Sequence, residues 1–209
     1  MDISSWLQLM VVCFLGAVSP GPSLALVISN TLSRGRSYGV ATSLGHAIGI
    51  WGWALLTAIG VAALLTLNSA VMVFLQTVGA CLLGYVGFRT IVGRNSASDP
   101  GLRVNGSVAW LQGGAEGFLI SLLNPKVALF FLAIFSHLVG EDLHWIEIGL
   151  MSLITAVIDG LWYVLVALIV TTAGVGSFVQ AKQSTIAIVS GAILFLIALY
   201  LLGTTLGSL

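Results

Sequence analysis

Two short segments of the sequence place proline beside small or polar residues in the middle of apolar runs. One is Ser19-Pro20-Gly21-Pro22-Ser23 and the other is Asn124-Pro125-Lys126, and Pro125 follows Pro20 by 105 positions. Proline removes a backbone hydrogen-bond donor and glycine loosens the chain, so each segment is expected to interrupt a helix. Inside a membrane, an interrupted helix offers N–H and C=O groups that can replace the water around a solute. We therefore take the residues of both segments as candidates for solute binding.

Two charged residues lie deep within apolar runs, Lys126 and Asp159. An ionised side chain at the middle of a membrane costs at least about 2.5–3.5 kcal/mol, so such residues face a cavity or each other. Counting from the ends of their runs places both at a similar depth, where they are able to pair. Two interpretations stay open: a structural ion pair, or a site that exchanges a proton or binds a charged group of a solute.

Two further titratable residues lie nearer the ends of their runs. Glu116 either reaches the membrane interface or forms a gate or an entry point for protons. His46 titrates near neutral pH when unperturbed, but it is equally a packed residue with hydrogen-bonded neighbours. Together with Asp159, these two residues are our candidates for proton coupling.

Two tryptophans, Trp51 and Trp162, fall in the middle of apolar runs. Tryptophan in membrane proteins is enriched at the interfaces, where its ring anchors a helix. A central position leaves packing against lipid or core as one interpretation and the wall of a solute cavity as the other. We include both in the candidate binding site.

The composition of the chain indicates the environment in which these residues lie. Of 209 residues, 58% are hydrophobic, only seven are Lys or Arg and seven Asp or Glu, and the mean hydropathy is +1.12. A soluble domain is typically about a quarter charged, so this chain is not a water-soluble globule. A net charge of zero gives no basic surface for nucleic acid. The sequence also has no P-loop and no His/Cys cluster, so we expect no enzyme activity, no cofactor and no bound metal.

Six apolar runs are long enough to span a membrane as helices, since about 20 residues cover its hydrocarbon core. We predict spans at about residues 6–29, 39–66, 71–92, 113–136, 147–171 and 184–206. Outer-membrane strands are about half this length and alternate in polarity, so the fold class is an all-α integral membrane protein. Glycines spaced four apart, at Gly45 and Gly49 and at Gly113 and Gly117, predict close helix packing.

The chain divides into two halves of three helices each. A polar segment at about residues 95–109 forms a cytoplasmic linker between residues 1–94 and 110–209, within a single transporter domain. Because each half has an odd number of helices, three, the second half enters the membrane in the opposite direction to the first. This arrangement defines an inverted-topology repeat. The broken first and fourth helices then occupy matching positions.

The charges outside the runs predict the orientation, because Lys and Arg in short loops stay in the cytoplasm. All the cations in the loops and near the ends of the runs fall on one side of the predicted topology, and they are Arg34, Arg36, Arg89, Arg94, Arg103 and Lys182. The opposite side carries Asp2, the turn 67–70 and the acidic segment 141–147. Both termini are therefore expected outside.

These motifs resemble the LysE/RhtB family of bacterial amino-acid exporters, and the resemblance covers nearly the whole chain. The matching segments are Ser19-Pro20-Gly21-Pro22, Leu32-Ser33-Arg34-Gly35-Arg36, Leu44-Gly45 with Gly49, Gly79 with Tyr85-Val86-Gly87, Leu122 to Phe131, Asp159 with Trp162, and Ser190-Gly191-Ala192. The family often has an acidic residue or Asn at Ser23 and an acidic residue at Ile50, so a strongly cationic substrate is disfavoured here.

The resemblance implies a secondary transporter that exports small amino acids or related metabolites, driven by an ion gradient and most simply by proton antiport. It places the chain in the bacterial cytoplasmic (inner) membrane as a multi-pass protein, with solute, protons and lipid as its partners and a homodimer as an open option.

Two other functions stay open. One is a passive channel or a scaffold subunit of a membrane assembly. The other is a membrane thiol–disulfide carrier, which needs two cysteines that meet beside the helix breaks. The two cysteines, Cys13 and Cys81, both lie in the first half and neither adjoins a proline pair.

Overall fold

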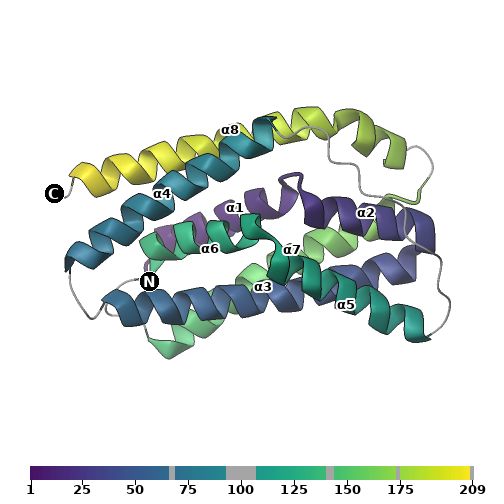
Figure 1. Ribbon diagram of the computed structural model, residues 1–209, viewed down its shortest axis with the longest axis horizontal. Coiled ribbons are helices and arrows are strands. Elements are labelled where there is room, and N and C mark those ends of the chain that lie inside the picture. The colour runs from purple at the N-terminus through teal and green to yellow at the C-terminus, as the bar shows by residue number, and fades with distance from the viewer. Residues whose placement is uncertain (66–68, 93–106, 140–143, 173–174, 208–209) are drawn as a thin grey trace.

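The computed structural model describes residues 1–65, 69–92, 107–139, 144–172 and 175–207, and this part of the chain contains helices but no strands. The helices are α1 Ile3–Val18, α2 Pro22–Arg34, α3 Arg36–Leu65, α4 Ser69–Val92, α5 Ser107–Leu123, α6 Pro125–Leu138, α7 Trp145–Ile169 and α8 Val175–Gly207. They form an elongated bundle (Figure 1). The all-α prediction is confirmed.

Both predicted interruptions divide a helix. The axis turns by 55° between α1 and α2 and by 59° between α5 and α6. Pro22 begins α2 and Pro125 begins α6. Proline is well suited to the first turn of a helix, where its missing N–H has no partner to lose and its φ angle is already helical. The prolines therefore end one half-helix and start the next.

Length and apolar composition identify several candidate membrane spans among the described residues. Arg36–Val61 of α3 and Trp145–Ile169 of α7 are each long enough to cross a bilayer alone. The bent pairs α1 with α2 and α5 with α6 qualify when each pair is counted as one span. Gly191–Thr205 of α8 is a shorter apolar helix.

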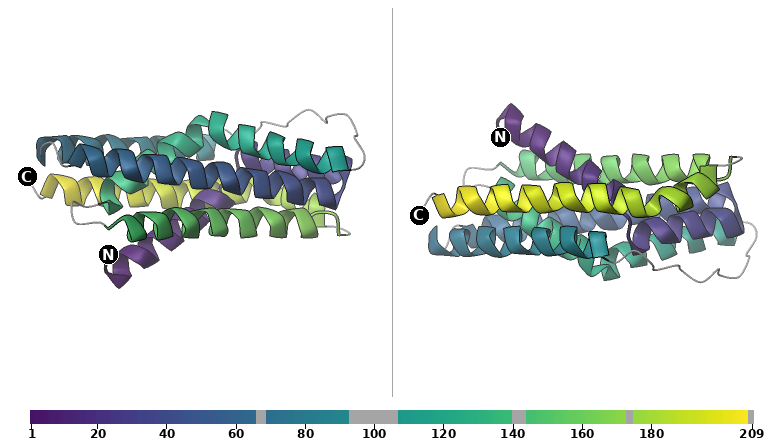
Figure 2. Two further views of the ribbon diagram at one scale, coloured as in Figure 1. Left: turned by 90° about the horizontal axis from the view of Figure 1, so that it is seen from below. Right: turned by 90° about the horizontal axis from the view of Figure 1, so that it is seen from above.

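Two helices, α3 and α4, each pack most extensively against two others. α3 lies between α5 and α7, and α4 packs against α6 and α8. α1 is inclined to the long axis that the other helices follow (Figure 2). The start of α1 and the end of α8 lie toward the same end of the bundle (Figure 1).

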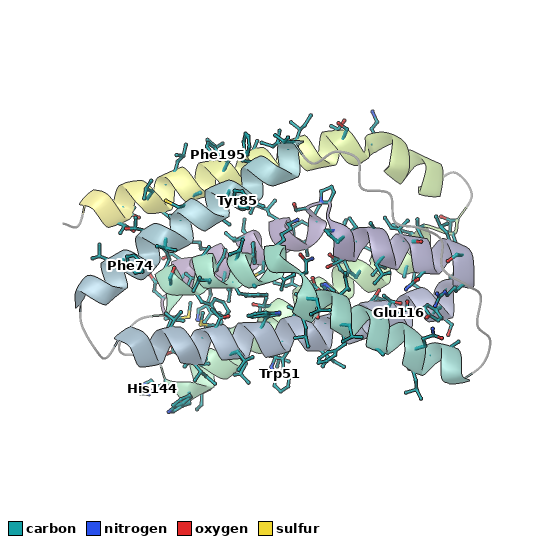
Figure 3. The ribbon with its side chains drawn as sticks, in the orientation of Figure 1. Trp51, Phe74, Tyr85, Glu116, His144 and Phe195 are labelled. Atoms are coloured by element: carbon teal, nitrogen blue, oxygen red, sulfur yellow. The ribbon has the colours of Figure 1, made fainter. Side chains whose placement is uncertain are left out.

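The outward faces of the bundle are as apolar as its interior. Phe131, Phe135 and Met151 are fully buried between helices. Phe74 on α4 is 65% exposed, and Phe195 on α8 also points outward (Figure 3). A helix that is hydrophobic on all sides suits a membrane, where the outer side chains meet lipid.

Polar groups gather at the two ends of the bundle. Arg34, Arg36 and Glu116 lie at one end, and His144 lies at the other (Figure 3). Met1 at this second end pairs its amino group with Glu147. Most of the predicted linker lies outside the described residues, as do Arg94, Arg103, Glu141, Asp142 and the first two residues of the turn 67–70.

The first helix begins with an aspartate cap. The carboxylate of Asp2 accepts hydrogen bonds from the backbone N–H of Ser5 at 3.0 Å and from the hydroxyl of Ser4 at 2.7 Å. These bonds, that of Ser5 first, lower the pKa of Asp2 from 3.8 to about 2. The cap is therefore fully in place above pH 3.8 and is lost only as the pH falls through about 2.

Candidate solute-binding site

A cavity lies where the two helix breaks meet, in the middle of the bundle. The empty space between its walls, including the part that opens outward, is about 500 Å³. Its lining comes from both breaks and from α1, α3, α6 and α7. The lining residues are Cys13, Gly16, Ala17, Ser19, Gly21, Ser23, His46, Ile50, Asn124, Lys126, Val127, Phe130, Phe131, Thr155, Asp159 and Tyr163. Seven of these were predicted as site residues, namely Ser19, Gly21, Ser23, His46, Asn124, Lys126 and Asp159.

Asn124 connects the two breaks. Its side-chain oxygen accepts the backbone N–H of Lys126 at 3.0 Å and so caps α6. Its amide nitrogen donates to the hydroxyl of Ser23 at 2.9 Å, in the first turn of α2. Asn is among the preferred residues at a helix N-terminus because its short side chain satisfies a free N–H there. One residue thus starts a half-helix and holds it against the other break.

Lys126 reaches from the first turn of α6 to the end of α1. Its ammonium nitrogen donates to the hydroxyl of Ser19 at 2.8 Å and to the backbone oxygens of Ser19 at 3.1 Å and Pro20 at 3.3 Å. Within the part of the chain that the structure describes, Lys126 forms no ion pair with Asp159. The pairing that the sequence left open is therefore not formed here, because oxygens of the first break bind the ammonium group instead.

Asp159 on α7 pairs with His46 on α3. The Oδ2 atom of Asp159 lies 2.8 Å from Nδ1 of His46, and both residues are buried. The ring of Tyr163 packs on the imidazole with a centroid distance of 4.8 Å. The second ring nitrogen of His46, Nε2, is buried without a hydrogen-bond partner among the described residues. The His46–Asp159 pair therefore forms part of the cavity wall.

The rest of the wall is largely apolar. Phe130, Phe131 and Ile50 contribute rings and a branched chain, and each is buried. Cys13 and Thr155 add small polar atoms, with 3.5 Å between the sulfur and the hydroxyl oxygen. An apolar cavity with a few fixed polar groups is typical of sites for small molecules.

Glu116 lies outside the cavity, in a polar cluster at the end of the bundle that carries Arg34. Its carboxylate accepts from Arg34 at 3.0 Å, Tyr38 at 2.8 Å and Asn30 at 2.9 Å. Asn30 also donates to Thr42 at 3.1 Å. The cluster joins α2, α3 and α5, so Glu116 holds three helices together.

The two predicted tryptophans do not line the cavity. Trp51 is 45% exposed and points away from the bundle (Figure 3). Trp162 packs edge-on against Phe14, with ring centroids 5.7 Å apart. On α3 the cavity face is set by His46 and Ile50, four residues apart, and Trp51 lies about 100° further round the helix.

Three lining residues of α7 follow a regular spacing. Thr155, Asp159 and Tyr163 are four residues apart, so they share one face. Thr155 was not predicted, and extending that spacing back from Asp159 is the signal that identifies it. Phe130 follows Lys126 by the same interval on α6.

The fold and the cavity define a multi-pass helical membrane protein with a polar site at two helix breaks. Comparison with known families is consistent with this class. Residues 14–205 match the LysE type translocator family, and the chain belongs to that family.

Named relatives are similar in length and moderately similar in sequence. An uncharacterized membrane protein of Pseudomonas aeruginosa is 31% identical over 158 residues, which cover 73% of this chain and 71% of the relative. A threonine efflux protein of Escherichia coli is 25% identical over 170 residues, 78% of this chain and 80% of the relative. An uncharacterized membrane protein of Vibrio cholerae is 25% identical over 162 residues, 77% and 78% of the two chains. No solved structure matches the chain.

Proposed function

We propose that the protein exports small neutral amino acids from the bacterial cytoplasm by proton antiport. The observation that carries the proposal is the meeting of Lys126 and the His46–Asp159 pair at one cavity beside both helix breaks. Membership of a translocator family and similarity to threonine efflux proteins support an amino-acid substrate.

The cavity offers matching partners for both charges of an amino acid. A carboxylate is favoured at the start of α6, where the helix dipole is positive and Lys126 lies close by. An ammonium group is favoured at the carboxylate of Asp159 on the opposite element, α7. Phe130, Phe131 and Ile50 leave an apolar space for a short side chain.

Proton coupling follows from competition at Asp159. When Asp159 carries a negative charge, it binds the ammonium group of the solute; when a proton from the outside neutralises the carboxylate, the ammonium group is released. His46 holds the carboxylate in place and is able to store the proton. A ligand shifts a transporter between states only through a difference in its affinity for them, and this protonation supplies one.

Glu116 completes the proposal at the cytoplasmic end. Its cluster with Arg34, Tyr38 and Asn30 lies between the cavity and that end of α2. We assign it to a cytoplasmic gate, through which solute enters and protons leave and whose opening requires the cluster to separate.

We further propose a single transporter domain of six spans in two inverted repeats, located in the inner membrane with both termini outside. The matching breaks before Pro22 and Pro125 support the repeat. The packing of α3 on α7 and of α4 on α8 also supports it, since a two-fold axis brings equivalent helices together. Arg34 and Arg36 at one end support the orientation.

The test is efflux from proteoliposomes loaded with labelled threonine, serine and alanine under an imposed proton gradient. Wild-type protein is expected to drive efflux that depends on the gradient, and Asp159→Asn is expected to abolish that dependence. Asp2→Asn is the matched control, because Asp2 is exposed and remote from the cavity. Equal efflux by wild type and Asp159→Asn contradicts the proposed coupling.

Two alternatives are separated by the same preparation. Accumulation of a solute against its own gradient excludes a passive channel or a scaffold. Unchanged transport by the Cys13→Ser, Cys81→Ser double variant excludes a thiol–disulfide carrier. Cys13 is buried at the cavity and Cys81 is exposed, and neither forms a disulfide.

A further inference from the structure

Lys126 is bound by oxygens in a way that resembles a cation in a small coordination site. Three oxygens of two consecutive residues, Ser19 and Pro20, receive its three N–H groups. An ammonium group has three donors and no acceptor, so this arrangement satisfies it fully. The connection between α1 and α2 is thus shaped around a positive charge.

The dipoles of the two half-helices explain why the charge lies there. Lys126 belongs to the first turn of α6, where the helix dipole is positive and a cation is disfavoured. The end of α1, immediately before Ser19, carries the negative end of another dipole. By extending across the cavity, the side chain moves its charge from an unfavourable helix end to a favourable one.

The site is built from the backbone of the break. Ser19 and Pro20 lie between the last residue of α1 and the first of α2, where the helical ladder is interrupted. Carbonyls in broken membrane helices coordinate cations such as Na⁺ in several transporter folds. Gly21 follows directly, and a Cβ atom there would meet the Lys126 nitrogen at 3.4 Å, an ordinary van der Waals contact, so Gly21 lies beside the ammonium group.

We propose that the oxygens of Ser19 and Pro20 form a binding site for a primary ammonium cation, that Lys126 is its built-in ligand, and that the filled site clamps the start of α6 to the end of α1. The ammonium group of Lys126 thus occupies the position that a free coupling cation would take at the first break. The proposal concerns the contact between α6 and α1 when no solute is bound. It does not depend on which solute the cavity binds.

The direct test is to remove the built-in ligand and supply it in solution. Lys126→Ala deletes the fragment that n-propylammonium replaces, so this cation is the probe. Binding to the folded state raises the melting temperature. We expect Lys126→Ala to melt below wild type and to regain at least about 2 °C with saturating n-propylammonium, whereas wild type, whose site is filled, does not respond.

Three controls make the result specific. Tetramethylammonium has the same charge but no N–H donor and is expected to give no shift, as is NaCl at equal ionic strength. Lys182→Ala removes the other lysine, which is exposed, and is expected to melt as wild type and to ignore the amine. Equal melting temperatures of Lys126→Ala and wild type overturn the proposal, as does an equal shift in the melting temperature of Lys126→Ala with all three salts.

A second measurement uses the wild-type protein and does not depend on how Lys126→Ala folds. Reductive methylation followed by mass spectrometry compares Lys126 with Lys182 in one molecule. We expect Lys126 to react at least ~10-fold more slowly, and Ser19→Ala, which removes one of its three acceptors, to speed its reaction several-fold while Lys182 stays unchanged. Equal rates for the two lysines, or no effect of Ser19→Ala, overturn the proposal.

Discussion

A carboxylate inside an apolar bundle is stable only when another group neutralises it or binds it, and for Asp159 that group is His46. The two residues come from α7 and α3, so their contact fixes the distance between these helices at the depth of the cavity. Among the residues that the structure describes, Nε2 of His46 has no hydrogen-bond partner, so one ring nitrogen of the pair is left without a contact.

At this pair, His46→Ala is expected to destabilise the protein by about 3–5 kcal/mol, because it leaves Asp159 buried without its partner. Thermal unfolding in detergent measures the loss. The double variant His46→Ala, Asp159→Ala is expected to be more stable than His46→Ala alone, since the unpaired charge is gone. If the two single losses simply add in the double variant, the pair is not coupled.

Two glycines of the cavity differ in the space around them. A Cβ atom added at Gly16 would lie 2.6 Å from the ring of Phe130, whereas one added at Gly21 would have no contact below 3.4 Å. We expect Gly16→Ala to displace the Phe130 ring, to cost about 1–3 kcal/mol and to reduce efflux, and Gly21→Ala to be tolerated. Melting and efflux assays on both variants decide this, and equal behaviour of the two contradicts it.

Sequence reasoning at this scale singled out Lys126 and Asp159, which both line the cavity, but left their partners open. Position along a helix follows from counting residues, whereas the partner depends on the direction of a long side chain and on which helix lies opposite. Trp51 shows the same limit, since a central tryptophan faces either cavity or lipid and only the packing of α3 decides which. His46 was recognised as titratable, but its contact with α7 required the tertiary fold.

Among the elements, α3 and α5 approach most closely, and glycines make this approach feasible. A Cβ atom added at Gly45 would lie 1.9 Å from the backbone oxygen of Gly114, and one added at Gly117 would lie 1.9 Å from the backbone oxygen of Thr42. Backbone atoms cannot turn aside as side chains do, so the helices must separate to admit a methyl group. The close packing predicted from the glycine spacing is confirmed here.

Gly45→Ala is therefore expected to destabilise the protein by about 1–3 kcal/mol or more through overpacking of α3 against α5. Gly52→Ala, on the same helix, is the matched control: its Cβ meets nothing within 4 Å. Replacing a helical glycine with alanine there is expected to stabilise by about 0.5–1 kcal/mol. Melting temperatures that fall alike in both variants contradict this account of the interface.

The breaks were predictable at the scale of elements because proline acts locally. Pro22 and Pro125 impose their effect through their own missing N–H and fixed φ, whatever surrounds them. The bend angles, 55° and 59°, were not predictable, since they depend on what the half-helices pack against. The inverted repeat remains a prediction that the similar bends support.

For the whole molecule, the end that each charge occupies predicts how the protein lies in the membrane. Arg34 and Arg36 mark one end of the bundle, while Asp2 and His144 lie at the other. Because cations near spans are retained in the cytoplasm, the first end is expected inside.

Cysteine labelling checks this orientation. In a Cys13→Ser, Cys81→Ser background, Ser4→Cys and Ser37→Cys place one thiol at each end, and both positions are exposed. We expect a membrane-impermeant maleimide to label Ser4→Cys in intact cells and Ser37→Cys only after the inner membrane is permeabilised. The reverse pattern places Arg34 and Arg36 outside and makes the protein an exception to the positive-inside rule. It also places the Glu116 cluster at the outer end, which contradicts its proposed role as the cytoplasmic gate.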